Sequence, residues 1–532
     1  MKPEKASKFP MALPALVMAC GALVIFASFL YPYFANYLGH DQSSYLFEAQ
    51  RFLSGAEIYG PRLMESNPPL IIWFSALPVM LARWTHGSAV FSFRLLVIAM
   101  IFGSVAWCVA LLRRSAAIVS PAAVALLGCA ILWIEFSIGP YDFGQRENLL
   151  FILLVPYVLA ASTSVVSRLS LAERCALGVA AGIAIWFKPQ DILILVGLEL
   201  FLAFRARTLR RALAPDFLAL VLTSSFILAL VLLLTPLYIT EIVPLLSDVY
   251  WAFGTESTLV LALSLDFYIL PLIAMFLVWL RLRRRLRDPE TPLALLICGF
   301  ASFVACDIQH TVWTYHRYPH RAFLLLALSY LLAERLDPVI GRLTSNSILV
   351  RRMVLAASGA SAIMLLALAI QPRLAHFGKA CTEKEDVDRI FAQYKPSTTV
   401  FVFSTSVYPL ASAYNHGLNW GGRFAHLWMM PAIIQNELGR TSPTFPFKQL
   451  SPETVARLAA LQRSETTEDL IYWRPSVVLV LHCSLDQPCQ GIEGKSFDMI
   501  SWFRQSPAFA STWSHYQQQP STGIFDVYKL DP

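Results

Sequence analysis

Asp41 is the first residue of this sequence whose type and position could do chemistry. It follows the first long apolar run by a few residues, in HDQSSYLFEAQRFL, so it would project from a rigid helix into the space just outside a membrane. A carboxylate there can accept a proton from a reacting group. The alternative is that Asp41 only caps the amphipathic helix beginning at SSYLFEAQRFL, and capping is compatible with catalysis.

A second concentration of charge is the segment YDFGQREN, which contains Asp142, Arg146 and Glu147 between two apolar runs. Ionisable groups at a membrane boundary are costly unless they are paired or used. One interpretation is a local ion pair between Arg146 and Glu147. In the other, Glu147 completes an acidic pair with Asp41, and Arg146 holds a phosphate through two hydrogen bonds.

Further cations lie in WFKPQDIL, which contains Lys188, and in DIQHTVWTYHRYPHR. The second segment supplies His310, His316, Arg317, His320 and Arg321. Such cations can stabilise a phosphate leaving group whose charge grows in the transition state. The histidine spacing is irregular and Asp307 is the only carboxylate nearby, so a divalent metal is possible but not indicated.

The composition indicates which elements position these residues. Of the 532 residues, 56% are hydrophobic and 14% are charged, which is too few charges to coat a soluble protein of this size. Apolar runs long enough to cross a hydrocarbon core of roughly 30 Å recur from residue 11 to about residue 370. The net charge of +7 resides in short bursts between these runs, so it carries topology information and does not indicate nucleic acid.

Basic clusters in membrane proteins mark the cytoplasmic side, and placing all six clusters there fixes the topology. The clusters are residues 2–8, 113–114, 168–174, 205–211, 281–287 and 335–352. The segment PPLIIWFSALPVMLARW must then lie at the outer interface without crossing. The pattern predicts about 11 crossings, near residues 10–33, 93–112, 121–139, 149–165, 175–187, 190–204, 217–238, 258–280, 291–306, 321–334 and 353–371. The N-terminus is then cytoplasmic, with a retained first helix, and everything from residue 372 is outside.

The tail has a different sequence style. β-rich runs (TTVFVFSTS, PSVVLVLHC and GIFDVYKL) alternate with helical stretches such as PETVARLAALQRSE, which predicts a small α/β domain of about 160 residues. Cys483 and Cys489, in HCSLDQPC, could form a disulfide if the tail is extracytoplasmic. The Gly-rich NHGLNWGGRF is either a polar-ligand loop or a plain turn.

With these residues identified, the first outer loop resembles a known superfamily. The shared pattern is an acidic residue after the first helix, then Tyr, Ala, Ser-Gly and a Pro-Leu-x-x-Trp stretch. Here these residues are Asp41, Tyr45, Ala49, Ser54-Gly55 and Pro68-Pro69-Leu70 through Trp73. The pattern resembles the dolichyl-phosphate-mannose protein mannosyltransferases and their bacterial relatives, the lipid A aminoarabinose transferases and the Rhizobium-type galacturonosyl transferases. The likeness extends to Arg94, Arg146-Glu147, Lys188 and Arg317-Tyr318-Pro319.

The resemblance implies a membrane glycosyltransferase of the C type, which moves a hexosyl or pentosyl group from a polyprenyl-phosphate donor to an envelope lipid, glycan or protein. It implies the bacterial inner membrane, a periplasmic active site and no certain cofactor. It assigns the two catalytic acids to Asp41 and Glu147. The donor-phosphate ligands are then Arg146, Lys188, Arg317 and Arg321, and the cavity residues are Gln42, Tyr45, Asn67, Asp142, His316 and Tyr318.

Two departures from the family pattern bear on the donor. Gln42 replaces the second acid of the usual Asp-Glu pair, and Asn67 stands where some relatives place a lysine that meets the donor phosphate. The donor phosphate must therefore be held by other cations.

The predicted architecture is a polytopic α-helical membrane protein with interfacial helices in its first outer loop. Residues 1–371 form the transmembrane glycosyltransferase domain, and residues 372–532 form a soluble periplasmic α/β domain. A transporter or flippase of lipid-linked sugars is the main alternative, although neither internal repeats nor Lys or Arg within the spans are evident. A non-catalytic scaffold is the third, but it gives no reason for the pattern in the first loop.

Overall fold

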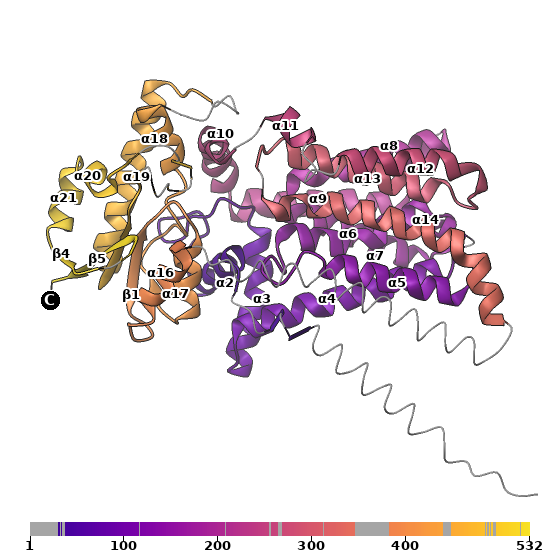
Figure 1. Cartoon of the computed structure of the whole chain (residues 1–532), viewed down its shortest axis with the longest axis horizontal. Coiled ribbons are helices and arrows are strands. Elements are labelled where there is room, and N and C mark those ends of the chain that lie inside the picture. The colour runs from indigo at the N-terminus through magenta and orange to yellow at the C-terminus, as the bar shows by residue number, and fades with distance from the viewer. Residues whose placement is uncertain are drawn as a thin grey trace, which may run out of the picture.

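The computed structural model describes residues 30–345, 382–439 and 448–531, apart from short gaps within these ranges. The predicted crossing at 353–371 and the predicted domain boundary at 371/372 lie outside the described residues, as does nearly all of the crossing at 10–33. The described chain forms a helical bundle with a smaller mixed α/β unit at one end (Figure 1).

The bundle consists of long apolar helices that run side by side (Figure 1). They are α4 (Ala89–Leu112), α5 (Pro121–Phe136), α6 (Arg146–Ser162), α7 (Leu171–Phe187), α8 (Ile192–Ala206), α9 (Pro215–Leu234), α12 (Ile269–Leu282), α13 (Glu290–Asp307) and α14 (Tyr318–Ser345). Within the described residues, α4, α9 and α13 are each long and apolar enough to cross a membrane. The predicted crossing at 258–280 corresponds to α11 (Thr258–Leu263) and α12, which flank residues outside the description.

Burial differs sharply between helices of the bundle. All the residues of α6 from Arg146 to Ser162 are buried except Leu153, so this helix is central. By contrast, α9 exposes Leu222 at 68%, Phe226 at 64% and Leu233 at 77%, which is the pattern of a helix that faces lipid. Helix α7 can pack closely on α9 because Gly178 has no side chain; a Cβ there would collide with the backbone oxygen of Asp216. Such small-residue contacts are typical of membrane helices.

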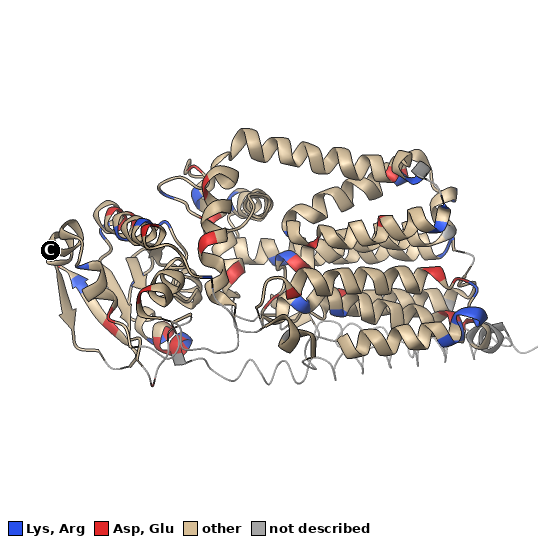
Figure 2. Ribbon diagram, turned by 90° about the horizontal axis from the view of Figure 1, so that it is seen from above, with Lys and Arg blue, Asp and Glu red and all other residues tan. Residues whose placement is uncertain are grey.

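The basic loops gather at one end of the bundle, away from the α/β unit. Arg114 pairs with Glu173 at 2.6 Å, Arg205 with Glu290 at 2.8 Å, and Arg168 donates to the backbone oxygen of Arg114 at 2.9 Å. Figure 2 shows charged residues concentrated near the helix ends, with long uncharged stretches between them. This common location agrees with placing these clusters on one side of the membrane.

The first outer loop contains α2 (His40–Phe52) and α3 (Leu70–Thr85), which pack against each other. Gly39 is the N-cap of α2 and Asp41 lies in its first turn, so the interpretation of Asp41 as the cap was wrong. The reason is that the helix begins three residues before the predicted SSYLFEAQRFL. The carboxylate is therefore oriented by the first turn and remains available for other contacts.

The C-terminal unit has a five-stranded sheet in the order β2-β1-β3-β5-β4. The strands are β1 (Thr399–Phe403), β2 (Asn419–Trp420), β3 (Val477–Leu481), β4 (Tyr516–Gln519) and β5 (Phe525–Leu530). β1 is parallel to β2 and β3, whereas β5 is antiparallel to β3 and β4. Strand β3 is buried along its length because the sheet is covered on both faces.

Helices surround this sheet and attach it to the first outer loop. They are α16 (Thr382–Phe391), α17 (Tyr408–Asn415), α18 (Met430–Leu438), α19 (Pro452–Trp473), α20 (Met499–Phe503) and α21 (Pro507–Trp513). Helix α17 contacts α2, and α18 contacts α10 (Val243–Val249). A disulfide joins Cys483 to Cys489 near the end of β3.

Candidate active site

A cavity of about 190 Å³ lies between the loop that contains α2 and α3, the end of the bundle remote from the basic loops, and the C-terminal unit. Helix α2 and the following turn supply Asp41, Tyr45, Glu65 and Asn67, and the start of α6 supplies Arg146. The remaining walls include aromatic residues of the bundle loops (Tyr250, Phe253, Trp313 and Tyr315) and residues of the C-terminal unit (Val407, Tyr408, Ala425, His426 and Trp428). The cavity thus combines a carboxylate, a guanidinium and an aromatic wall.

The Asp41 carboxylate is held by two neighbours. Its Oδ2 accepts a hydrogen bond from Gln145 Nε2 at 2.7 Å, and its Oδ1 lies 3.3 Å from His40 Nε2. The other ring nitrogen of His40 lies 2.7 Å from the hydroxyl of Tyr141, which fixes the ring. The side chain of Asp41 keeps 19% of its surface exposed, so a proton-carrying group can reach it.

Arg146 stands at the N-terminus of α6 and lines the same cavity. Its Nε donates to the hydroxyl of Tyr45 at 3.2 Å, and Tyr45 donates in turn to Gln145 Oε1 at 3.1 Å. Among the described residues, no carboxylate lies within ion-pair distance of the guanidinium, and its two terminal nitrogens donate no side-chain hydrogen bond. A planar fork with free donors beside a helix N-terminus is suited to bind a phosphate.

Glu147 and Lys188 form an ion pair. The sequence had predicted separate roles for them, Glu147 as a catalytic acid and Lys188 as a ligand of the donor phosphate. Their side chains are 0% and 1% exposed, and His316 Nε2 lies 3.6 Å from the same Glu147 oxygen. None of these three residues lines the cavity. The suggested local pair between Arg146 and Glu147 was therefore wrong, because successive residues point to different sides of α6 and Lys188 reaches Glu147 first.

The other residues expected in the site lie in the layer behind the cavity. Gln42 donates to the backbone oxygen of Phe143 at 3.0 Å, Tyr318 donates to that of Ile134 at 3.1 Å, and Arg321 donates to that of Ser137 at 2.7 Å. Neither they nor Asp142 and Arg317 line the cavity, whereas Tyr45 and Asn67 do. The structure therefore brings four of the twelve expected residues, Asp41, Tyr45, Asn67 and Arg146, around one space.

Two further acids in the first loop were missed by the sequence analysis. Glu65 lines the cavity, and its Oε1 accepts hydrogen bonds from both the backbone and the side chain of Asn67, at 2.8 and 2.6 Å. Glu48 lies on the Asp41 face of α2, and burial together with the Glu65 charge raises the pKa of Glu48 well above its ordinary value. The i, i+7 spacing of Asp41 and Glu48 was the signal that could have found this helix face.

The cavity depends on how the C-terminal unit docks. Arg51 of α2 donates to the backbone oxygens of Trp420 and Gly422 at 2.6 and 2.7 Å, and its guanidinium stacks over the Trp473 ring at 4.5 Å. The backbone nitrogen of Met64 donates to the Arg423 oxygen at 3.1 Å. The Gly-rich NHGLNWGGRF thus serves as a docking segment for the first loop.

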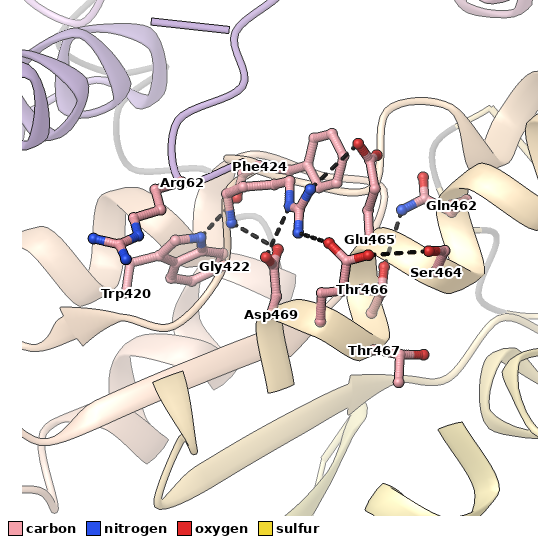
Figure 3. Close-up of polar contacts among 12 residues, drawn as sticks. Arg62, Trp420, Gly422, Phe424, Gln462, Ser464, Glu465, Thr466, Thr467 and Asp469 are labelled. Atoms are coloured by element: carbon pink, nitrogen blue, oxygen red, sulfur yellow. Dashed lines mark hydrogen bonds and ion pairs between the residues drawn. The ribbon is translucent and has the colours of Figure 1, made fainter. Parts of the chain in front are cut away.

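Arg423 anchors that docking segment to α19. Its Nε donates to Asp469 at 2.8 Å, and its terminal nitrogens donate to Glu468 at 2.8 Å and Glu465 at 3.3 Å. Figure 3 shows Asp469 and Glu465 rising from α19 beside Trp420, Gly422 and Phe424. Burial raises the pKa of Glu465 to about 7 and of Asp469 to about 6, even with this cation present.

No group of three or more His, Cys, Asp or Glu residues within the described part of the chain is arranged to hold a metal ion. The acids of the cavity, Asp41 and Glu65, lie on α2 and on the segment between α2 and α3.

Comparison with solved structures shows a similar fold over almost the whole chain. ArnT from Cupriavidus metallidurans in its apo state is 16% identical, with a TM-score of 0.56 and coverage of 96% of this chain and 98% of that one. The same protein bound to undecaprenyl phosphate is 14% identical, with a TM-score of 0.53 and coverage of 98% of both chains. No family model matches the sequence, and no curated protein is similar to it.

Proposed function

We propose that this protein is a glycosyltransferase that moves a sugar from a polyprenyl-phosphate carrier to an acceptor of the cell envelope. The observation that carries the proposal is the single cavity in which the Asp41 carboxylate and the open guanidinium of Arg146 face the same space. The fold supports it, because the similar ArnT, a lipid A aminoarabinose transferase, has been solved with undecaprenyl phosphate bound.

In the proposed reaction, an acceptor hydroxyl oxygen attacks the anomeric carbon of the sugar. The bond from that carbon to the phosphate oxygen breaks, and its electron pair leaves with the polyprenyl phosphate. Asp41 takes the hydroxyl proton, held in place by Gln145 and His40. Arg146 neutralises the charge that grows on the phosphate, through donors that this structure leaves open.

The remaining predicted residues act behind this pair. Glu147 and Lys188 are buried beneath the start of α6, where their ion pair holds the helix end that presents Arg146. Arg317 and Arg321 border the same layer and are the next candidates for contact with the donor. Asn67, held by Glu65, replaces the family lysine as a neutral cavity wall.

The topology belongs to this proposal. The basic clusters gather at the end of the bundle remote from the cavity, so the cavity and the C-terminal unit face the periplasm if the clusters are cytoplasmic. A C-terminal alkaline phosphatase fusion should be active in cells, and a cytoplasmic fluorescent reporter at the same position should be dark. The reverse pattern would refute the orientation.

The enzymatic test uses the purified protein in detergent with undecaprenyl-phosphate-linked hexoses and pentoses and an envelope extract as acceptor. Release of undecaprenyl phosphate is the readout. Asp41→Asn should lower turnover by about 10²- to 10⁴-fold, the range for a lost general base, while Glu57→Gln, an exposed acid of the same loop, should not. Wild-type protein that releases no undecaprenyl phosphate from any donor would overturn the proposal.

A further inference from the structure

Two polar atoms in the cavity wall are buried and have no hydrogen-bond partner among the described residues. They are Nδ1 of His426 and the indole Nε1 of Trp428. Both residues line the cavity, and Trp428 is 5% exposed as a whole. Leaving a buried donor or acceptor unpaired costs free energy, so such groups in a native protein require an explanation.

Both side chains come from one short segment between β2 and α18. Its backbone is fixed, since Leu427 N donates to the oxygen of Ser404 at 2.9 Å and Trp428 N to that of His426 at 2.9 Å. The segment begins next to Arg423, whose oxygen accepts from Met64 of the first loop. The two side chains that carry the unpaired atoms are therefore attached to a hydrogen-bonded backbone segment.

Aromatic rings line the same cavity as these two side chains. Phe253 packs edge-on to His426, with ring centroids 6.4 Å apart, and Trp313 stacks on Tyr315 at 6.0 Å. Aromatic faces with a few polar groups between them match the two kinds of surface on a sugar ring, its C–H face and its hydroxyl edge. The acid and the guanidinium of the cavity remain for the reacting centre.

We propose that His426 and Trp428 form the subsite for the sugar ring of the donor, so that the C-terminal unit selects which sugar is transferred. This inference rests on the proposed function. The cavity volume of about 190 Å³ lies below the roughly 300–1,000 Å³ of pockets for drug-sized ligands, which suits a single sugar ring. Trp428 donates its indole N–H to a ring hydroxyl, and Nδ1 of His426 pairs with another, each after a small ring rotation.

The test separates binding of the sugar from binding of the lipid phosphate. Undecaprenyl phosphate and undecaprenyl-phosphate-linked sugars are titrated against wild type, Trp428→Phe and His426→Gln, and the affinity gained by adding the sugar is compared. In each variant the sugar-dependent gain in affinity should be about two- to tenfold smaller than in wild type, which is the value of one hydrogen bond. The affinity for the bare lipid phosphate should be unchanged.

Trp502→Phe is the matched control, because it removes an indole N–H that donates to Glu437 at 3.0 Å elsewhere in the C-terminal unit. It should leave the sugar-dependent gain intact. The unfolding temperature of Trp428→Phe should be no lower than that of wild type, because the substitution removes an unpaired donor. A loss of affinity in this variant therefore does not result from loss of folded protein.

If both variants keep the full sugar-dependent gain while wild type transfers sugar and Asp41→Asn does not, the subsite proposal is overturned and the proposed function stands. If wild type binds no lipid-linked sugar more tightly than the bare lipid phosphate and transfers none, both proposals fall together.

Discussion

Arg146 and Arg423 are both buried arginines in the part of the molecule remote from the basic loops, but their surroundings differ. Arg423 donates from its Nε and both terminal nitrogens to three carboxylates of α19, with its side chain 5% exposed. Arg146 has one side-chain hydrogen bond, to Tyr45, and faces a cavity. One guanidinium is saturated by the fold, whereas the other has donors to offer to a ligand.

The same contrast extends to the neighbours of each arginine. The docking segment around Arg423 is tied to α2 by Arg51 and to α19 by the acids, which makes it a structural junction. The cavity wall instead contains two buried side-chain atoms, on His426 and Trp428, that have no hydrogen-bond partner among the described residues. Hydrogen-bond saturation of the guanidinium therefore distinguishes these two arginines, which residue type and burial do not.

The largest expected effect concerns the Glu147–Lys188 pair, which is buried and lies outside the cavity. Lys188→Met leaves a buried carboxylate unpaired and should lower the free energy of unfolding by about 3–5 kcal/mol. Adding Glu147→Leu should recover most of that loss, because it removes the unpaired charge. Thermal and denaturant unfolding in detergent measure the stability of the single and the double variant. A Lys188→Met protein as stable as wild type would contradict a structural role for the pair.

A smaller effect is expected at the domain junction. Arg51→Ala removes the two charge-assisted hydrogen bonds that reach backbone oxygens of the C-terminal unit, so it should weaken docking of that unit by about 1.5–3 kcal/mol. Hydrogen exchange should then quicken at residues 420–428 and turnover should fall, although Arg51 does not line the cavity. Arg62→Ala loses only a stacking contact on Tyr472 and serves as the control. Equal exchange in the two variants would argue against the junction.

The smallest expected effect is a pH dependence of the free energy of unfolding, which arises because burial keeps the His426 ring neutral. Burial lowers the pKa of His426 to about 4 in the folded protein, against about 6.5 in an unfolded chain. As the pH falls through this window the unfolded chain binds the proton first, so this residue's contribution to stability is complete above about pH 6.5 and is lost toward pH 4.

Relative to His426→Gln, wild type should therefore lose about 1–2 kcal/mol between pH 7 and pH 4.5, after allowance for solvent screening, because the residue as a whole keeps some exposed surface. Parallel denaturant titrations of the two proteins across this range give the difference directly. A difference that does not vary with pH would show that the ring is not held neutral.

The sequence predicted elements well wherever the signal is local. TTVFVFSTS, PSVVLVLHC and GIFDVYKL contain β1, β3 and β5, and PETVARLAALQRSE begins α19, because β-branched alternation and helical periodicity are readable within a few residues. The short β2 and the polar β4 were not anticipated, since neither YQQQ nor NW carries an apolar pattern.

The candidate site was less predictable because it depends on distant contacts. Asp41 and Arg146 were identified from local charge in apolar surroundings, but the partner of Glu147 is Lys188, which arrives from another loop. The walls from His426 and Trp428 reach Asp41 only through docking of the C-terminal unit, across almost 400 residues. No local pattern in the sequence encodes that contact.

The central claim is that Arg146 is the open arginine and Arg423 the saturated one, and the direct measurement is a parallel comparison of their alanine variants. Thermal unfolding and titration with undecaprenyl phosphate are measured on each purified protein. Arg146→Ala should lose about tenfold to a hundredfold in affinity, or 1.5–3 kcal/mol, with nearly normal stability, and Arg146→Lys should recover part of it. Arg423→Ala should lose about 3–5 kcal/mol of stability, with normal affinity in the folded protein. An Arg146→Ala protein that unfolds early yet binds undecaprenyl phosphate as wild type does would contradict the account.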